Sequence, residues 1–205
     1  MANSSDPQEI KKNQILEAAY NRFSHYGYAK TTMNDIAGDL AMSKALLYYY
    51  FPDKSQLYAG IVRKLSNEYL TALKDKVEQA ATIDEAFFFI LQKMHQTIAS
   101  HYDFFDYIKL NQQNLPVPIC NVIQEIHRTE VSLLTELYRR QAGAAFEEKH
   151  DLQQIIQLIF KALDSVNGSI DKQKLTFFPD AEQLEAIYTQ KKLLLQILLN
   201  GLKIL

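Results

Sequence analysis

The sequence has 205 residues, of which 47% are hydrophobic, so the chain is long enough to bury one large core or two smaller ones. Its formal net charge of −2 excludes a protein whose whole surface is basic. A single cysteine excludes an intrachain disulfide, and no apolar run approaches the roughly 18 residues of a membrane span, so we expect a cytoplasmic protein without a membrane partner.

Two helices are predicted at the start of the chain. Apolar residues at helical spacing run from residue 10 to residue 23, and this first helix is expected to end near Gly27, where glycine can adopt the left-handed conformation. Thr32 is expected to cap a second helix, because Asp35 follows three residues later and completes the pattern of a capping box.

A third short helix is expected to begin after Ser43, a favourable N-cap residue, and to end before Pro52. Its apolar residues are Leu46, Leu47, Tyr50 and Phe51. The second and third patterns therefore place two short helices, joined by a tight turn, within residues 32–51. That arrangement is typical of a helix-turn-helix.

The rest of the chain also predicts helices, and most of them are longer. They begin with a long amphipathic helix from Ser55 and continue over about 82–100, 103–113, 119–140, 151–169 and 181–202. The last two are apolar over wide arcs, so each needs burial on more than one side. Either they lie in an ordinary core, or one face packs on the core and the other on a second subunit.

The third helix supplies the candidate DNA-contacting residues. Four of its side chains share the arc opposite the apolar stripe: Lys44, Ala45, Tyr48 and Tyr49. The Lys44 ammonium suits a phosphate or a guanine edge, Ala45 can touch a thymine methyl group, and the tyrosine hydroxyls suit phosphates or bases. The alternative, that these tyrosines only pack between helices, stays open on this evidence alone.

Flanking residues extend the predicted DNA contacts. Ser43 is one of these predicted contact residues. Thr31 and Thr32 can hold a phosphate together with the backbone N–H groups at the start of their helix. Lys54, at the start of the next helix, can hold another. The net charge of +2 over residues 1–64, against −4 for the remainder, has the sign expected for such a module but is small.

Residues 10–60 resemble the N-terminal signature of TetR-family regulators in residue type and spacing. The matching residues are Phe23, Gly27, Tyr28, Thr31, Thr32, Asp35, Ile36, Ala37, Met42, Ser43, Lys44, Leu47, Tyr48, Tyr49, Tyr50, Phe51, Lys54, Leu57 and Tyr58. Two positions depart from the signature, because Ala41 and Ala45 stand where glycine is common. A left-handed conformation at Ala41 would cost on the order of 1 kcal/mol.

The resemblance implies an all-α fold. Residues 1–52 would form a three-helix DNA-binding domain, and residues 53–205 a larger helical domain that binds an effector and dimerises through its last two helices, about 151–169 and 181–202. The implied function is that of a ligand-responsive repressor. As a homodimer it would bind a near-palindromic operator in double-stranded DNA and be released by a small-molecule effector.

The effector region is predicted from local chemistry only. Residues in and just after the densest aromatic stretch can line an apolar cavity: Phe88, Met94, His95, Tyr102, Phe105 and Cys120. Aromatic residues at helical spacing are, however, more often part of a core. No ligand set for a metal, no cofactor-binding glycine pattern and no nucleophile motif is recognised, so we expect neither cofactor nor catalysis. The non-DNA alternative is a helical protein-interaction or scaffold module.

Overall fold

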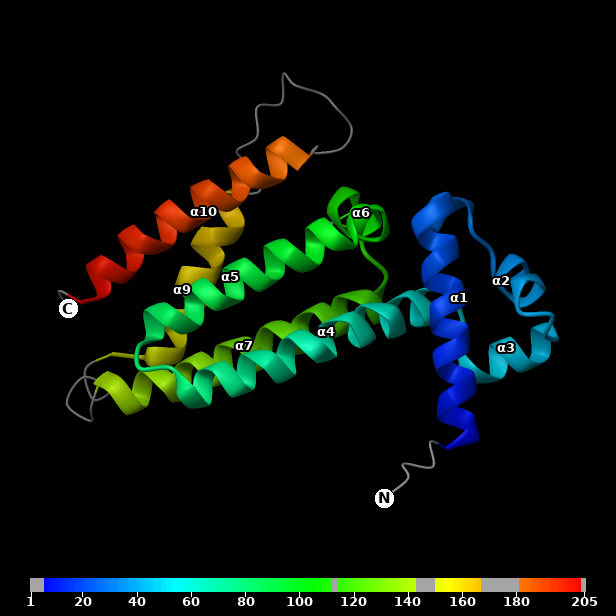
Figure 1. Ribbon diagram of the computed structural model, residues 1–205, viewed down its shortest axis with the longest axis horizontal. Helices are drawn as coiled ribbons and strands as arrows, with labels where there is room; N and C mark the ends of the chain where they lie inside the picture. Colours follow the sequence, from blue (N-terminus) through cyan, green and yellow to red (C-terminus); the bar gives the residue numbers. More distant parts are fainter. Residues whose placement is uncertain (1–5, 112–113, 143–149, 167–180, 204–205) are drawn as a thin grey trace. The chain divides into compact units, whose positions relative to one another are not determined.

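The computed structural model describes residues 6–111, 114–142, 150–166 and 181–203, and within them the predicted all-α fold is confirmed, because they form helices and no strand (Figure 1). The chain divides into two compact units, Met1–Asn67 with His101–Glu125 and Glu68–Ser100 with Ile126–Leu205. The division between these units does not fall after residue 52. The functional domain boundary expected at that residue stays a prediction.

The first unit contains α1 (Pro7–Lys30), α2 (Met33–Asp39), α3 (Lys44–Tyr50) and α6 (Tyr102–Leu110), with the first part of α4 (Lys54–Gln79) and of α7 (Val117–Ala142). Figure 1 shows α2 and α3 beside α1. The buried face of α1 consists of Ile15, Leu16, Ala19 and Phe23, which recur at helical spacing. Helix α1 contacts both α2 and α6, and α3 in turn contacts α2.

Gly27 interrupts α1 with a φ of 78° and a ψ of 160°. The positive φ predicted for this glycine is confirmed, but the ψ angle differs from that of the left-handed helical conformation. The chain therefore turns sharply and adds one more helical turn before Thr31, instead of ending the helix in the expected way. Only glycine adopts these angles without strain.

The second unit contains the remainder of α4 and α7 together with α5 (Ile83–Ser100), α9 (Leu152–Ser165) and α10 (Ala181–Leu202). Helix α10 contacts both α5 and α9. The shared core includes Leu73, Phe87, Ile90, Leu134, Ile156, Leu195 and Leu199. None of the described helices combines the length and the apolar character that a membrane crossing requires.

Several predicted helix ends need correction. Helix α6 ends at Leu110 and α7 ends at Ala142, whereas ends near 113 and 140 were expected. Residues 112–113, 143–149 and 167–180 lie outside the described residues, and with them the helix end expected near 169. Helix α7 begins at Val117, two residues earlier than predicted. Pro118 is compatible with this start, because the first turn of a helix does not use its N–H groups.

Candidate nucleic-acid interface

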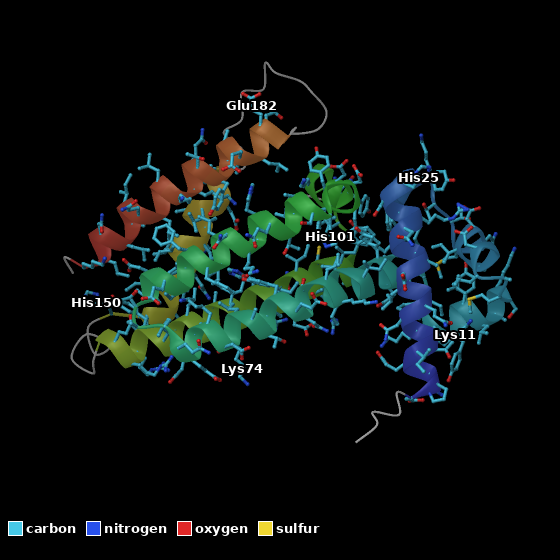
Figure 2. All side chains as sticks on the ribbon, in the orientation of Figure 1. Lys11, His25, Lys74, His101, His150 and Glu182 are labelled. Atoms are coloured by element: carbon cyan, nitrogen blue, oxygen red, sulfur yellow. The ribbon has the colours of Figure 1, made fainter. Side chains whose placement is uncertain are left out.

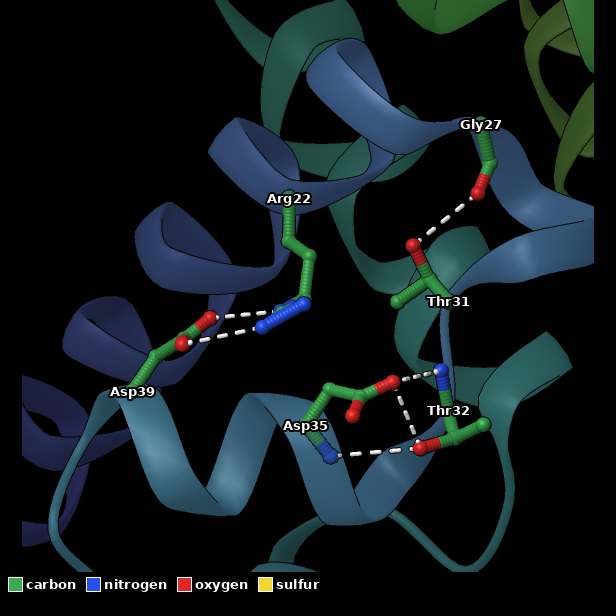
Figure 3. A network of polar contacts seen from close by, with 6 residues as sticks. All are labelled: Arg22, Gly27, Thr31, Thr32, Asp35 and Asp39. Atoms are coloured by element: carbon green, nitrogen blue, oxygen red, sulfur yellow. Dashed lines mark hydrogen bonds and ion pairs between the residues drawn. The ribbon is translucent and has the colours of Figure 1, made fainter.

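The start of α2 is fixed by the predicted capping box. The Asp35 amide donates to the Thr32 hydroxyl oxygen (3.2 Å), and the Thr32 amide and hydroxyl donate to the Asp35 carboxylate (2.9 and 2.7 Å; Figure 3). These bonds hold the pKa of Asp35 below its ordinary value, chiefly through the Thr32 hydroxyl. The N-terminal amides of α2 are thus partly satisfied by the protein itself.

A bidentate ion pair ties the end of α2 to α1. The Arg22 guanidinium donates from Nε and Nη2 to the two carboxylate oxygens of Asp39, at 2.7 and 3.2 Å (Figure 3). A planar guanidinium matches a carboxylate in this two-point geometry. Arg22 therefore orients α2 and is engaged within the protein.

The turn between α2 and α3 depends on Ala41. Its φ is +46°, the left-handed conformation that the resemblance to a glycine-containing turn implied, and it is the only described non-glycine residue with a positive φ. The turn is closed by backbone bonds from the Ala41 amide to the Gly38 carbonyl and from the Met42 amide to the Ala37 carbonyl, both 3.0 Å. The short connection between the two helices is therefore made at some conformational cost.

Helix α3 is anchored by one side and exposed on the other. Ser43 accepts a bond from the Leu46 amide (3.2 Å), as predicted for an N-cap, and Leu47 is fully buried. Four residues predicted to face outward are exposed: Lys44, Ala45, Tyr48 and Tyr49. Leu46, one of the apolar residues of this helix, is also exposed, because it lies about 100° around the helix from Leu47.

Three other predicted contact residues are engaged in hydrogen bonds within the protein. Thr31 is fully buried and donates its hydroxyl to the Gly27 carbonyl (2.9 Å), so its side chain has no access to a phosphate in this conformation. Lys54 donates from Nζ to the carbonyls of Tyr28 (2.7 Å) and Thr31 (2.9 Å), and burial lowers its pKa. Thr32 is exposed but bonded to Asp35. The outward face of α3 is therefore the principal candidate surface.

This arrangement of short helices has relatives among known proteins. Residues 15–61 match the model of the bacterial regulatory proteins of the tetR family. Over 64 residues the chain is 41% identical to the HTH-type transcriptional regulator RutR of Escherichia coli (strain K12), covering 31% of this chain and 30% of RutR. The crystal structure of a transcriptional regulator from Cytophaga hutchinsonii ATCC 33406 aligns with a TM-score of 0.70 and 25% identity, over 93% of this chain and 97% of that one. Together these matches indicate a transcriptional regulator of the TetR family, with the family match located in residues 15–61.

A further solved structure aligns with most of this chain. The transcriptional regulator FadR from Bacillus subtilis, solved in complex with stearoyl-CoA, has a TM-score of 0.65 and 18% identity over 92% of this chain and 98% of its own. At that identity the likeness establishes the fold alone. The match to the curated relative RutR spans less than a third of RutR's length and is confined to 64 residues.

Aromatic side chains from α1, α4 and α6 pack together behind the helix-turn-helix. We call this the α1–α6 aromatic cluster; it comprises Tyr20, Phe23, Tyr28, Tyr58, Phe104 and Tyr107. The Tyr58 ring stacks on Phe104 at 4.3 Å, and the Tyr58 hydroxyl donates to the Phe104 carbonyl. Tyr28 stacks on Tyr107 at 3.8 Å. Burial raises the pKa of Tyr58 strongly and that of Tyr28 to about 12, so both phenols stay neutral.

His101 adds a polar contact to this cluster. It immediately precedes α6 and is labelled in Figure 2, and its Nδ1 lies 2.7 Å from the Tyr20 hydroxyl of α1. The cluster and this hydrogen bond together hold α6 against α1, the helix that also contacts α2. A movement of α6 would therefore disturb contacts of the DNA-binding module directly.

The six predicted effector residues do not form one group. Phe88 and Met94 pack against the core of the second unit, where His95 stacks on Tyr188 at 4.4 Å. Tyr102, Phe105 and Cys120 belong to the first unit. An effector site made of these residues stays a prediction.

A cavity of about 370 Å³ lies between α7 and α9, within the second unit, and none of the predicted effector residues lines it. All but one of the residues that line it are of polar or charged type: His127, Arg128, Val131, Ser132, Thr135, Glu136, Arg139, Gln153 and Gln157. Sequence reasoning missed it, because these residues are ordinary polar positions of amphipathic helices. In the part of the chain that the structure describes, no three His, Cys, Asp or Glu side chains gather as metal ligands would.

Proposed function

We propose that this chain is a transcriptional repressor that acts in the cytoplasm, binds a near-palindromic operator in double-stranded DNA as a homodimer, and is released by a small-molecule effector. The observation that carries the proposal is the outward face of α3, which is exposed while its opposite side is anchored by Leu47 and Ser43. A helix held in this way fits the major groove with its side chains directed at base edges.

The exposed residues of α3 can contact both phosphates and base edges. Lys44 supplies a cation at the start of the helix, and the side chain of Tyr49 is 71% exposed, the largest exposure among the large hydrophobic residues that are described. Tyr48, 46% exposed, offers a second phenol for a phosphate. Phosphate contacts set affinity and register, whereas contacts to base edges set the sequence that is bound.

Dimerisation through α9 and α10 is supported by apolar residues that this single chain leaves exposed. Leu158 on α9 is 55% exposed, and Leu193 and Ile197 on α10 are 63% and 59% exposed. Leu193 and Ile197 are four residues apart, so they share one face of α10, away from the buried Leu195. A second copy of the chain would cover these surfaces and present two α3 helices to major grooves one helical turn apart.

Release by an effector requires that the ligand bind the DNA-bound and the free conformation with different affinities. The solved FadR complex with stearoyl-CoA makes acyl-CoA thioesters the first ligand class to test with this chain. The α1–α6 aromatic cluster supports α6 as a connection to the helix-turn-helix, since its rings join α6 to α1 and α4.

To test the proposal, purified protein is used to select duplexes from a random DNA library. The affinity of the protein for the selected sequences is then measured across a salt series. We expect an inverted repeat whose affinity falls steeply with salt, and a loss of binding in Lys44→Ala and Tyr49→Ala without loss of folding. A folded dimer that enriches no sequence at any salt would support the scaffold alternative instead.

A further inference from the structure

The outward face of α3 has an apolar half that the fold does not use. Ala45, Leu46 and Tyr49 are exposed and adjacent, since 45 and 49 are one turn apart and 46 and 49 are three residues apart. Leu46 is 41% exposed, while the core contact of α3 is made by Leu47 on another face. Lys44 and Tyr48 occupy the opposite flank. Single exposed apolar residues need no explanation, but this contiguous patch on so short a helix does.

The chemistry of the patch restricts what it can recognise. Neither Ala45 nor Leu46 carries a side-chain hydrogen-bond donor or acceptor, so neither can read the polar edges of guanine, cytosine or adenine. The C5-methyl group of thymine is the apolar group that the major groove offers. A leucine placed against a guanine or cytosine edge would instead desolvate polar atoms without replacing their hydrogen bonds.

We propose that Leu46, together with Ala45, reads thymine methyl groups, so that each operator half-site contains a thymine facing this patch. The inference rests on the proposed function, because it assumes that α3 enters the major groove. It goes further by naming a base and the residue that selects it. Tyr49, beside the patch, adds the contact area of its ring.

Deoxyuridine substitution tests the idea on the selected operator. Replacing one thymine at a time by deoxyuridine removes only the methyl group and keeps every hydrogen-bonding group of the base pair. We expect one or two positions per half-site at which this change weakens binding about fourfold, the value for burying one methyl group. Leu46→Ala should bind the unmodified operator more weakly and lose most of that discrimination.

Tyr48→Phe serves as the matched control, because Tyr48 lies on the other flank of α3 and its loss of a hydroxyl should leave the methyl dependence intact. If native protein binds a selected operator but tolerates deoxyuridine at every position, thymine reading is wrong while operator binding stands. If Leu46→Ala keeps the full methyl dependence, Leu46 is not the reader. Failure to select any operator would overturn the proposed function and this inference together.

Discussion

The hydroxyl of Tyr69 on α4 donates a hydrogen bond to the carboxylate of Glu130 on α7, whose side chain is only 5% exposed. Burial raises the pKa of Tyr69 strongly, with the Glu130 charge acting in the same direction, so the phenol keeps its proton and remains a donor. A buried carboxylate that loses a donor bears the full cost of its desolvation. This contact joins two helices that each contribute to both compact units.

Tyr69→Phe should therefore lower the free energy of unfolding by about 1–3 kcal/mol, measured by urea denaturation followed by circular dichroism. Arg63→Gln is the control, because the Arg63–Glu125 pair is about half exposed on both sides and should contribute less than about 1 kcal/mol. Equal urea midpoints for native protein and Tyr69→Phe would show that this hydrogen bond contributes nothing to stability.

His127 gives stability a dependence on pH. Its Nδ1 lies 3.8 Å from the Glu130 carboxylate, and the interaction with that carboxylate raises the pKa of His127 above its ordinary value of about 6.5. A raised pKa in the folded state means that the protonated form stabilises the fold. This stabilisation is complete below about pH 6.5 and is lost as the pH rises through the folded-state pKa.

His127→Gln should therefore be less stable than native protein at low pH, by less than about 1 kcal/mol because the imidazole is 43% exposed. The difference should shrink as the pH is raised from about 6 to about 8. Urea midpoints at several pH values measure it, and the same trend should be absent in a Glu130→Gln background. A constant difference across this range would contradict the assignment.

Gly60 should not tolerate a side chain. A Cβ atom there would lie 3.0 Å from the Leu16 Cδ2 and 3.1 Å from a carbon of the Phe51 ring, and both neighbours are buried. Gly60→Ala should lower stability by about 1 kcal/mol, since overpacking outweighs the gain in helix propensity. Gly201→Ala, with nothing within 4 Å of its Cβ, should raise it by up to about 1 kcal/mol. Thermal or urea unfolding of both variants checks these opposite signs.

Ala41 and Ala45 should respond oppositely to the same substitution. Ala41→Gly relieves a φ of +46° and should stabilise the protein by about 0.5–1 kcal/mol. Ala45→Gly, within α3, should destabilise it by up to about 1 kcal/mol. Unfolding free energies of the two variants decide the matter, and destabilisation by Ala41→Gly would mean that the turn is not strained.

Local signals predicted the helix-turn-helix closely. The caps at Thr32 and Ser43 involve residues three apart in the chain, so their side-chain chemistry alone determines where α2 and α3 begin. For the same reason the burial of Leu47 and the exposure of Tyr49 follow from helical periodicity.

Contacts between distant segments were not predictable in the same way. Lys54 was assigned to a phosphate, yet its ammonium binds carbonyls 23 and 26 residues away, a pairing that depends on how α4 meets the turn after Gly27. Tyr102 and Phe105 were grouped with Phe88 by their closeness in sequence, but the fold places them in different compact units. Composition and spacing carry no information about such pairings.

The α1–α6 aromatic cluster also gives the protein an optical signal of its own. The chain has no tryptophan and twelve tyrosines, and four of these tyrosines belong to the cluster: Tyr20, Tyr28, Tyr58 and Tyr107. Near-ultraviolet circular dichroism reports fixed packing of aromatic rings. In this protein the tyrosine signal of that spectrum therefore includes a contribution from the contacts between α6 and α1. A ligand that displaces α6 would change that band in unlabelled protein, before any operator is known.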